Sequence, residues 1–189
     1  MPDPSRLRTA VFLDRDGTIC EEVGYLNHVS RFRMFPFVAA SLRRLNEAGY
    51  RVIVVSNQSG VARGYFPESL VKEVTHRMTQ QLSEAGARVD AVYYCTHASA
   101  ENCPCRKPKT GMLECAAREH QIDLQRSFVV GDRYIDIELA RNAKARGILV
   151  RTGYGEGELA WREAKWPAPP DLIADDLAQA VDWILRQPQ

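Results

Sequence analysis

The sequence contains neither a long apolar run nor an excess of charge of one sign. No stretch approaches the roughly 20 apolar residues of a membrane-spanning helix, and the first segment, MPDPSRLRTA, lacks the apolar core of a signal peptide. The 25 basic and 24 acidic side chains nearly cancel, so no overall field favours nucleic acid or anionic lipid. We therefore expect a soluble cytoplasmic protein with no nucleic-acid partner and no membrane partner.

The sequence also lacks internal repeats and low-complexity tracts, and its number of cysteines is odd. The 189 residues fit one ordinary domain, so we expect a single domain over residues 1–189, and a monomer. The cysteines number five, and an odd count in a chain with intracellular features argues against a disulfide framework.

Short runs of β-branched and aromatic residues alternate with helical patterns along most of the chain. This alternation predicts βαβ units, and hence an α/β fold: a Rossmann-like three-layer α/β/α sandwich with a mostly parallel sheet. The expected strands cover residues 10–13, 51–56, 89–94, 127–130, 148–151 and, at a sheet edge, 172–174.

Helices are predicted where apolar residues recur on one face. The residues of the two clearest stripes are Val38, Leu42 and Leu45, and Leu70, Val74, Met78 and Leu82. Gly49 and Gly86 stand where these helices should end, and Pro67 suits the first turn of the second. A further helix around Leu139 is expected to end near Gly147.

Two aspartates directly follow the first predicted strand. In AVFLDRDGTIC an apolar run leads into Asp14 and Asp16, and in an open parallel sheet ligands bind at the carboxyl ends of the strands. Like charges repel, so a divalent cation between these acids and a third one would hold them together. Asp132 follows another predicted strand and can be that third acid. A set of oxygen ligands favours Mg²⁺.

The same acids suit phosphoryl transfer, because the cation would neutralise a phosphate enough for a carboxylate to attack it. We expect Asp14 to be the nucleophile that forms an aspartyl-phosphate, and Asp16 to act as general acid and then as general base. Gly17 should allow a sharp turn, and Thr18 should cap that turn or bond to it.

Donors for the phosphate oxygens are expected at neighbouring strand ends. Ser56 offers a hydroxyl at the end of the second strand, and the amide of Asn57 can add a donor. Lys107 offers a compact positive charge, and Arg106 can grip a second anionic or hydroxyl group of the substrate.

The segment CTHASAENCPC contains three thiols and an imidazole at the spacing of a closed tetrahedral zinc site. These side chains are Cys95, His97, Cys103 and Cys105. A local disulfide and unrelated buried thiols are the alternatives. Four protein ligands leave no open position, so the zinc would be structural. Because Arg106 and Lys107 directly follow Cys105, the zinc would also fix both cations.

In combination these motifs resemble those of the haloacid dehalogenase-like superfamily of phosphatases. The matching positions are Asp14-x-Asp16-Gly17-Thr18, Ser56, Lys107 and Gly131-Asp132-x-x-x-Asp136. Within the superfamily, SNQSGVARGYF, the Cys-His-Cys-Cys loop, RKPKTGM and VRTGYGE are similar to the heptose bisphosphate phosphatases. The resemblance covers roughly residues 10–157.

The resemblance implies magnesium-dependent removal of the C7 phosphate of a small sugar phosphate, in heptose supply for lipopolysaccharide. It implies that Asp14, the backbone carbonyl of Asp16 and Asp132 bind Mg²⁺, with Asp136 in support. Substrate contacts are implied for Glu22, Val23, Gly24, Tyr25, Ser56, Asn57, Gln58, Ser59, Arg106, Lys107 and Arg133.

Two positions depart from that family's pattern. Thr96 stands in the zinc loop where proline is usual, which hardly threatens zinc binding, and Arg133 stands where lysine is common. The chain leaves no room for a large cap domain between the first two strands. The flap of residues 17–33, the loop of residues 57–66 and the zinc loop must therefore shape the pocket.

Other functions remain open at this point. Histidinol-phosphate phosphatases share the zinc loop and are the main alternative, followed by other small-molecule phosphomonoesterases. Polynucleotide 3′-phosphatases share DxDGT and SNQ, but the neutral charge balance and the absence of a basic, aromatic groove count against them. Outside enzymes, the alternatives are a receiver-like domain that uses an aspartyl-phosphate as a switch and a zinc-stabilised binding module.

Overall fold

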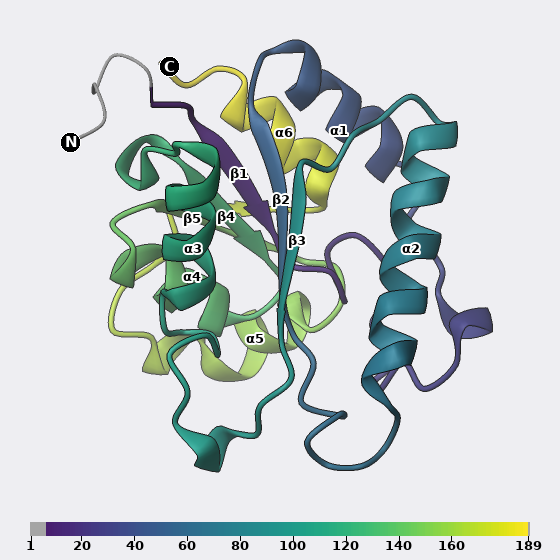
Figure 1. Ribbon diagram of the computed structural model, residues 1–189. Coiled ribbons are helices and arrows are strands. Elements are labelled where there is room, and N and C mark those ends of the chain that lie inside the picture. The colour runs from purple at the N-terminus through teal and green to yellow at the C-terminus, as the bar shows by residue number, and fades with distance from the viewer. Residues whose placement is uncertain (1–6, 189) are drawn as a thin grey trace.

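The computed structural model describes residues 7–188 and contains one six-stranded sheet (Figure 1). The strand order is β3-β2-β1-β4-β5-β6, and every pairing is parallel. All six predicted strands are present, with ends shifted by at most two residues. Their bounds are β1 Ala10–Leu13, β2 Arg51–Asn57, β3 Ala91–Cys95, β4 Phe128–Gly131, β5 Arg146–Val150 and β6 Leu172–Ala174.

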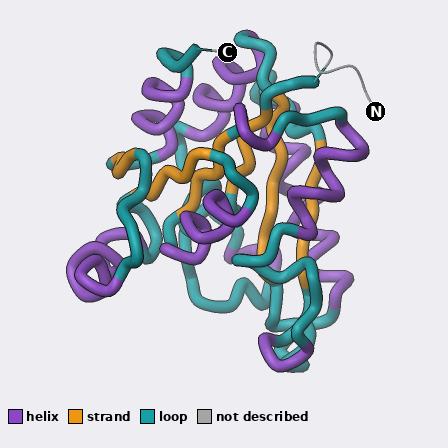
Figure 2. Tube along the Cα trace, turned by 90° about the vertical axis from the view of Figure 1, so that its left-hand side faces the viewer, coloured by secondary structure: helices purple, strands orange, loops and turns teal. Residues whose placement is uncertain are grey.

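Helices cover both faces of the sheet, which confirms the three-layer prediction. Figures 1 and 2 show helices packed on either side of the strands. One hydrophobic cluster joins the sheet to α1, α2 and α6, and a second joins it to α3 and α4. The helices are α1 Val38–Glu47, α2 Glu68–Glu84, α3 Gly111–His120, α4 Tyr134–Asn142, α5 Gly155–Arg162 and α6 Leu177–Ile184. Short 3₁₀ turns are η2 Val29–Arg31, η3 Ser99–Glu101, η4 Leu124–Arg126 and η5 Glu163–Lys165.

Strand β1 shows why the strands read as continuous apolar runs. Val11 and Leu13 belong to the cluster on one face, and Ala10 and Phe12 belong to the cluster on the other. All four side chains are completely buried. Because helices cover both faces, neither face can carry the polar residues that alternate in a half-exposed strand.

Two helix ends match the sequence, and one helix start does not. Gly49 and Gly86 follow α1 and α2 with φ angles of 84° and 73°, as a glycine that ends a helix should. Pro67 has an extended ψ of 157° and precedes α2, rather than lying in its first turn as predicted.

The predicted end of α4 near Gly147 is wrong. The helix ends at Asn142, and Gly147 lies within β5. A β-carbon at position 147 would lie 3.1 Å from the β-carbon of Ala140, so this glycine allows close contact between strand and helix. Helices α3, α5 and α6 were not predicted; α5 buries only Gly155 and Glu158 and so has no apolar stripe to recognise.

The described chain has no cap domain between β1 and β2, where it holds only the flap, η2 and α1. The loops after β2 and β3 extend together beyond the lower end of the sheet in Figure 1. Across residues 7–188, no helix combines the length and the apolar character needed to cross a membrane.

The register of the sheet brings residues far apart in sequence to one edge. Leu13 pairs with Val54 on β2 and with Val130 on β4. The next residue, Asp14, donates its backbone N–H to the carbonyl of Val130 at 2.9 Å. The carboxyl ends of β1, β2 and β4 therefore open onto the same space.

Candidate active site

Three carboxylates meet where β1 and β4 end. Asp14 and Asp132 directly follow these strands, and Asp136 comes from the first turn of α4. One oxygen of each lies within 4.8 Å of the others, and all three side chains are buried. The first and fourth strands thus bring their acids together, as expected from the sequence.

Burial changes the acidity of two of these groups. It raises the pKa of Asp14 to about 7, although the positive charge of Lys107 opposes the rise. It also raises the pKa of Asp132 to about 8, and the neighbouring charges of Asp14 and Asp136 add to that rise. Keeping both Asp14 and Asp132 ionised is therefore unfavourable without a further positive charge.

The acid cluster fits a hard divalent cation. The backbone N–H of Tyr154 donates to Asp132 Oδ2 at 2.8 Å. The second oxygen, Asp132 Oδ1, is buried and accepts no hydrogen bond from any described residue. Leaving a buried carboxylate oxygen unpaired is costly. A metal ion would satisfy it, and a set of oxygen donors suits Mg²⁺.

Two glycines make room for Asp132. A β-carbon at Gly17 or at Gly153 would overlap Asp132 Oδ2, and both glycines have a positive φ, of 78° and 58°. The hydroxyl of Thr152 donates to the carbonyl of Gly17 and ties the two turns together. The sharp turn expected at Gly17 is present, and the loop after β5 forms a wall of the site that the sequence analysis did not assign.

Thr18 bonds to the turn through its backbone N–H, which donates to the carbonyl of Arg15 at 3.4 Å, but the predicted side-chain cap is wrong. Its side chain is fully buried, and its Oγ1 has no hydrogen-bond partner within residues 7–188. Backbone groups close the turn instead: Gly17 N–H donates to the carbonyl of Cys20 at 2.8 Å, and the N–H groups of Ile19 and Cys20 donate to that of Arg15 at 2.9 and 3.0 Å. A turn closed in this way needs no side-chain cap.

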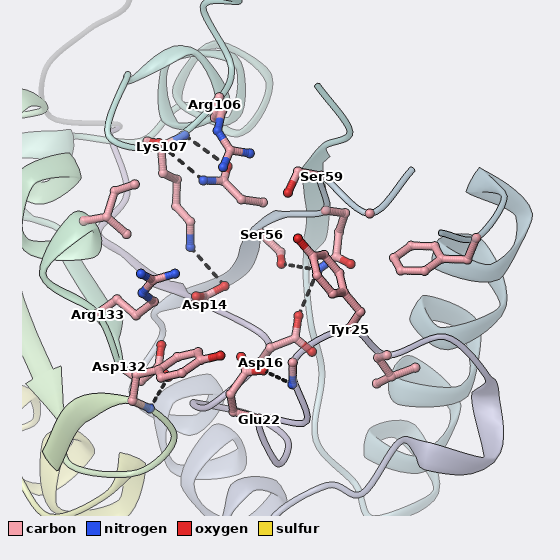
Figure 3. A pocket seen from close by; sticks show the side chains of 18 residues that line it. Asp14, Asp16, Glu22, Tyr25, Ser56, Ser59, Arg106, Lys107, Asp132 and Arg133 are labelled. Carbon is pink, nitrogen blue, oxygen red and sulfur yellow. Dashed lines mark hydrogen bonds and ion pairs between the residues drawn. The ribbon is translucent and has the colours of Figure 1, made fainter. Parts of the chain in front are cut away.

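Lys107 lies against the predicted nucleophile: its Nζ is 3.0 Å from Asp14 Oδ1 (Figure 3). The same Nζ is 2.7 Å from Asp136 Oδ1 and also donates to the carbonyl of Val55. Burial disfavours the ammonium, but the charges of Asp136 and Asp14 outweigh burial and raise the pKa of Lys107. The lysine therefore keeps its charge where a phosphate would meet Asp14.

Asn57 holds the backbone of Lys107. Its side-chain Nδ2 donates to the Lys107 carbonyl at 3.3 Å, and its Oδ1 accepts from the Lys107 N–H at 3.1 Å. The side-chain amide that could have served as a phosphate donor is thus engaged in tying the end of β2 to Lys107.

Gln58 links the predicted acid to the predicted phosphate donor. Its Nε2 donates to Asp16 Oδ2 at 2.9 Å and to Ser56 Oγ at 2.8 Å (Figure 3). Because Ser56 Oγ accepts this bond, its own proton remains available for a phosphate oxygen. Arg15, which the sequence analysis left without a role, forms an ion pair with Asp16 at 2.8 Å.

These side chains line a cavity of about 230 Å³. The predicted residues on its walls are Asp14, Asp16, Glu22, Gly24, Tyr25, Ser56, Asn57, Gln58, Ser59, Arg106, Lys107, Asp132 and Arg133. Val23 is not on the wall and packs against the hydrophobic core. Residues that were not predicted also contribute: Leu26, Gly60, Phe66, Ile135 and Tyr154.

Aromatic rings and one further acid shape the rim of this cavity. The guanidinium of Arg133 lies 5.1 Å from the ring centroid of Tyr154, and its Nε is 3.7 Å from a carboxylate oxygen of the buried Glu158. Tyr25 packs edge to face against Tyr65, with ring centroids 4.7 Å apart. Tyr154 lies in the segment VRTGYGE, which the sequence analysis noted without giving this residue a role.

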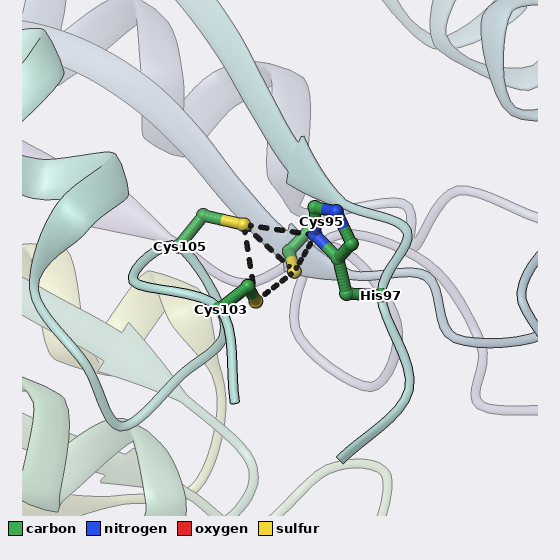
Figure 4. A group of neighbouring side chains, drawn as sticks. All are labelled: Cys95, His97, Cys103 and Cys105. Carbon is green, nitrogen blue, oxygen red and sulfur yellow. Dashed lines mark hydrogen bonds between the residues drawn. The ribbon is translucent and has the colours of Figure 1, made fainter. Parts of the chain in front are cut away.

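The side chain of Cys95 at the end of β3 and those of His97, Cys103 and Cys105 in the following loop converge on one point (Figure 4). Their sulfur atoms are 3.0 to 3.5 Å apart, and His97 Nδ1 lies 3.5 Å from Cys95 Sγ and 3.3 Å from Cys105 Sγ. All are free thiols, so the disulfide alternative is not supported. The group can therefore hold a metal ion.

Known families and proteins match this chain. A model of the haloacid dehalogenase-like hydrolases matches residues 19–141, and a HAD-hydrolase-like family model matches residues 104–180. The chain is 46% identical to D-glycero-D-manno-heptose-1,7-bisphosphate 7-phosphatase of Thermosynechococcus vestitus, covering 94% of this chain and 95% of that protein. It is 42% identical to D-glycero-beta-D-manno-heptose-1,7-bisphosphate 7-phosphatase of Haemophilus influenzae, covering 80% and 88%.

Solved structures agree over nearly the whole chain. The D,D-heptose 1,7-bisphosphate phosphatase from B. bronchiseptica, complexed with magnesium and phosphate, superimposes with a TM-score of 0.87 at 30% identity, covering 95% of this chain and 99% of that one. The enzyme of the same name from Burkholderia thailandensis has a TM-score of 0.72 at 28% identity, covering 95% and 100%. The similarity thus extends from motifs to the complete fold.

Proposed function

Because the chain belongs to the haloacid dehalogenase-like hydrolases, we propose that it is a magnesium-dependent phosphatase that removes the C7 phosphate of D-glycero-D-manno-heptose 1,7-bisphosphate. The observation that carries this proposal is the position of Asp14, which lines a cavity beside the ammonium of Lys107 and within 4.8 Å of a carboxylate oxygen of Asp132. Membership of a hydrolase family rejects the receiver-like and binding-module alternatives.

We assign the metal ions as follows. Mg²⁺ would be held by Asp14, the backbone carbonyl of Asp16 and Asp132. Asp136 would support the site through Lys107, with which it forms an ion pair. When bound, the magnesium ion offsets the repulsion between phosphate and carboxylates. Zinc would occupy the cluster of three cysteines and one histidine, where four protein ligands give it a structural role.

In the first step, a carboxylate oxygen of Asp14 forms a bond to phosphorus as the bond between phosphorus and the C7 oxygen breaks. Asp16 gives its proton to the departing oxygen, so this oxygen leaves as a hydroxyl group of the sugar 1-phosphate and not as an alkoxide. Lys107 steadies the charge near Asp14, and the hydroxyl of Ser56 donates to a phosphate oxygen.

In the second step, the oxygen of a water molecule forms a bond to phosphorus, and the bond between phosphorus and Asp14 breaks. The proton of that water passes to the carboxylate of Asp16. Asp14 is returned as a carboxylate, Asp16 regains its proton, and inorganic phosphate leaves.

The substrate's second phosphate would be held by Arg106 and Arg133, which both line the cavity. Arg106 is tied to the metal-binding loop because its Nη1 donates to the carbonyl of His97 at 3.2 Å. Arg133 is supported by Tyr154 and Glu158. These two arginines give the cavity a preference for a bisphosphate.

One comparison of substrates tests the proposed function. Phosphate release in the presence of Mg²⁺ is measured with both anomers of the heptose bisphosphate, histidinol phosphate and a 3′-phosphorylated oligonucleotide. A heptose bisphosphate should give a kcat/KM at least about 100-fold above the other two, and Asp14→Asn should release no phosphate. Faster release from histidinol phosphate would identify that compound, and not the heptose bisphosphate, as the preferred substrate. No release from any of the compounds would reject the phosphatase function.

We also propose that the chain is one domain over residues 1–189, and that it works as a monomer in the cytoplasm. The shared sheet supports a single domain, because both main hydrophobic clusters are built on its two faces. Light scattering of the purified protein should give a mass near 21.3 kDa, and twice that mass would contradict the monomer.

A further inference from the structure

The carboxylate of Asp16 receives more hydrogen bonds than the proposed chemistry explains. Arg15 Nε donates to Asp16 Oδ1 at 3.1 Å, and Arg15 Nη2 donates to Oδ1 at 3.0 Å and to Oδ2 at 2.8 Å. Gln58 Nε2 adds another bond to Oδ2 at 2.9 Å. Both oxygens of the predicted acid are therefore held by donors from the protein.

Arg15 is placed where it cannot touch a substrate. Its side chain is only 4% exposed, and it does not line the cavity that Asp16 lines. Although burial disfavours the charged guanidinium, the charge of Asp16 raises the pKa of Arg15. Among the described residues, its guanidinium donates hydrogen bonds to Asp16 alone, so the direct contact of this side chain with the catalytic groups is made through that carboxylate.

The shape of the guanidinium matters as much as its charge. Its planar fork fixes both the position and the rotation of a carboxylate, whereas a lysine ammonium provides a single point charge. Gln58, which is also buried, completes the arrangement because the same amide donates to Ser56 Oγ at 2.8 Å. The predicted acid and the predicted phosphate donor thus share one fixed network.

We propose that Arg15 and Gln58 are positioning residues that hold the carboxylate of Asp16 at the leaving oxygen of the substrate. This role rests on the proposed function, in which Asp16 donates a proton to that oxygen. Proton donation depends on distance and orientation, and a displacement of about 1 Å can cost about 100-fold in rate. Loosening Asp16 should therefore slow the departure of those leaving groups that need a proton.

Two substrates with different leaving groups test this role. The sugar bisphosphate releases an alcohol, which needs a proton, whereas 4-nitrophenyl phosphate releases a nitrophenolate that is stable without one. Single-turnover measurements with enzyme in excess and Mg²⁺ present isolate the first step for each compound. They are made on the wild-type protein, Arg15→Met, Arg15→Lys and Gln58→Leu.

Arg15→Met should slow release of the sugar at least about 10-fold, and release of nitrophenolate less than about 3-fold. Arg15→Lys keeps the charge without the fork, so it should show the same selective loss. Gln58→Leu should show a smaller selective loss, and it keeps the proposal testable if both Arg15 variants fail to fold.

Arg51→Met is the matched control. This substitution also removes an ion pair between an arginine and a largely buried acid, Asp90, but it lies at the start of β2, at the end of the strand away from the cavity. Both rates should stay at the wild-type value in this control. Equal losses with the two substrates, or wild-type rates in Arg15→Lys, would overturn the positioning role. Failure of the wild-type protein to cleave the sugar bisphosphate would instead reject the proposed substrate, and the same ratio would then be measured with another alkyl phosphate that it cleaves.

Discussion

At the scale of single residues, Asp132 depends on neighbours that have no side chain. Its carboxylate lies against Gly17 and Gly153, and a β-carbon on either glycine would overlap its Oδ2. Gly153 also has a φ of 58°, which residues other than glycine rarely adopt. Position 153 therefore controls where the unpaired oxygen of Asp132 points.

Gly153→Ala should weaken Mg²⁺ binding and lower kcat/KM at least about 10-fold, because the new methyl group displaces Asp132. Calorimetric titration of the folded variant with Mg²⁺ measures the first effect without turnover. Gly157→Ala is the matched control, since a β-carbon there has no neighbour within 4 Å, and it should bind Mg²⁺ like the wild type. Unchanged Mg²⁺ affinity in Gly153→Ala would contradict this account.

The sequence was sufficient to place Asp14 and Asp132 together, because each directly follows an apolar run and parallel strands end at one edge. It could not show what Arg15 does, because the direction of that side chain depends on the geometry of a closed turn. The same turn explains why the expected side-chain cap by Thr18 is absent. Backbone hydrogen bonds close the turn, and such bonds cannot be predicted from the identity of the side chains.

At the scale of elements, the loop after β3 connects the cluster of Cys95, His97, Cys103 and Cys105 to Lys107. Cys105 lies two positions before Lys107, and Arg106 between them is bonded to the carbonyl of His97. A change in the geometry of the cluster should therefore shift the end of the loop, where the ammonium of Lys107 contacts the carboxylate of Asp14.

Cys105→Ser should lower phosphate release by about 10-fold or more by loosening Lys107. Activity and zinc content are measured together, and removal of zinc by a chelator, followed by restored Mg²⁺, should reproduce the loss. Cys115→Ser is the control, since Cys115 lies on α3 outside the cluster. Unchanged turnover in fully zinc-free protein would refute the link between loop and lysine.

The elements were predicted unequally for physical reasons. Strands covered on both faces are apolar throughout, and all six could be found from composition. The stripe on α3 contains only Met112, Leu113 and Ala116 as buried residues, so periodicity alone did not reveal it. Gly147 was predicted to end a helix because glycine often has that role. In the structure it lies in β5, where the lack of a side chain allows α4 to approach closely at Ala140.

At the scale of the whole molecule, the acid cluster couples folding to pH. Asp14 and Asp132 titrate near 3.8 in the unfolded chain, and burial raises their pKa to about 7 and about 8 in the folded protein. Between these limits the folded state keeps protons that the unfolded state has lost. Their contribution to stability is therefore present at low pH and declines as pH rises from about 4 through 8.

Without Mg²⁺, this contribution should make the midpoint of thermal unfolding lower at about pH 8.5 than at about pH 6. Added Mg²⁺ should raise the midpoint more at the higher pH, where both carboxylates are ready to bind it. Calorimetry at the two pH values measures both effects. A variant with Asp14→Asn and Asp132→Asn should lose most of the difference, and an equal difference in that variant would assign it to other groups.

The strand order has a consequence for how the molecule is made. Strand β1 lies between β2 and β4, so during translation its second edge stays open until residues 128–131 have left the ribosome. A nascent chain interrupted before that point carries an uncovered template for β-pairing with other chains. It also lacks Asp132, so premature termination should yield an aggregation-prone fragment without phosphatase activity.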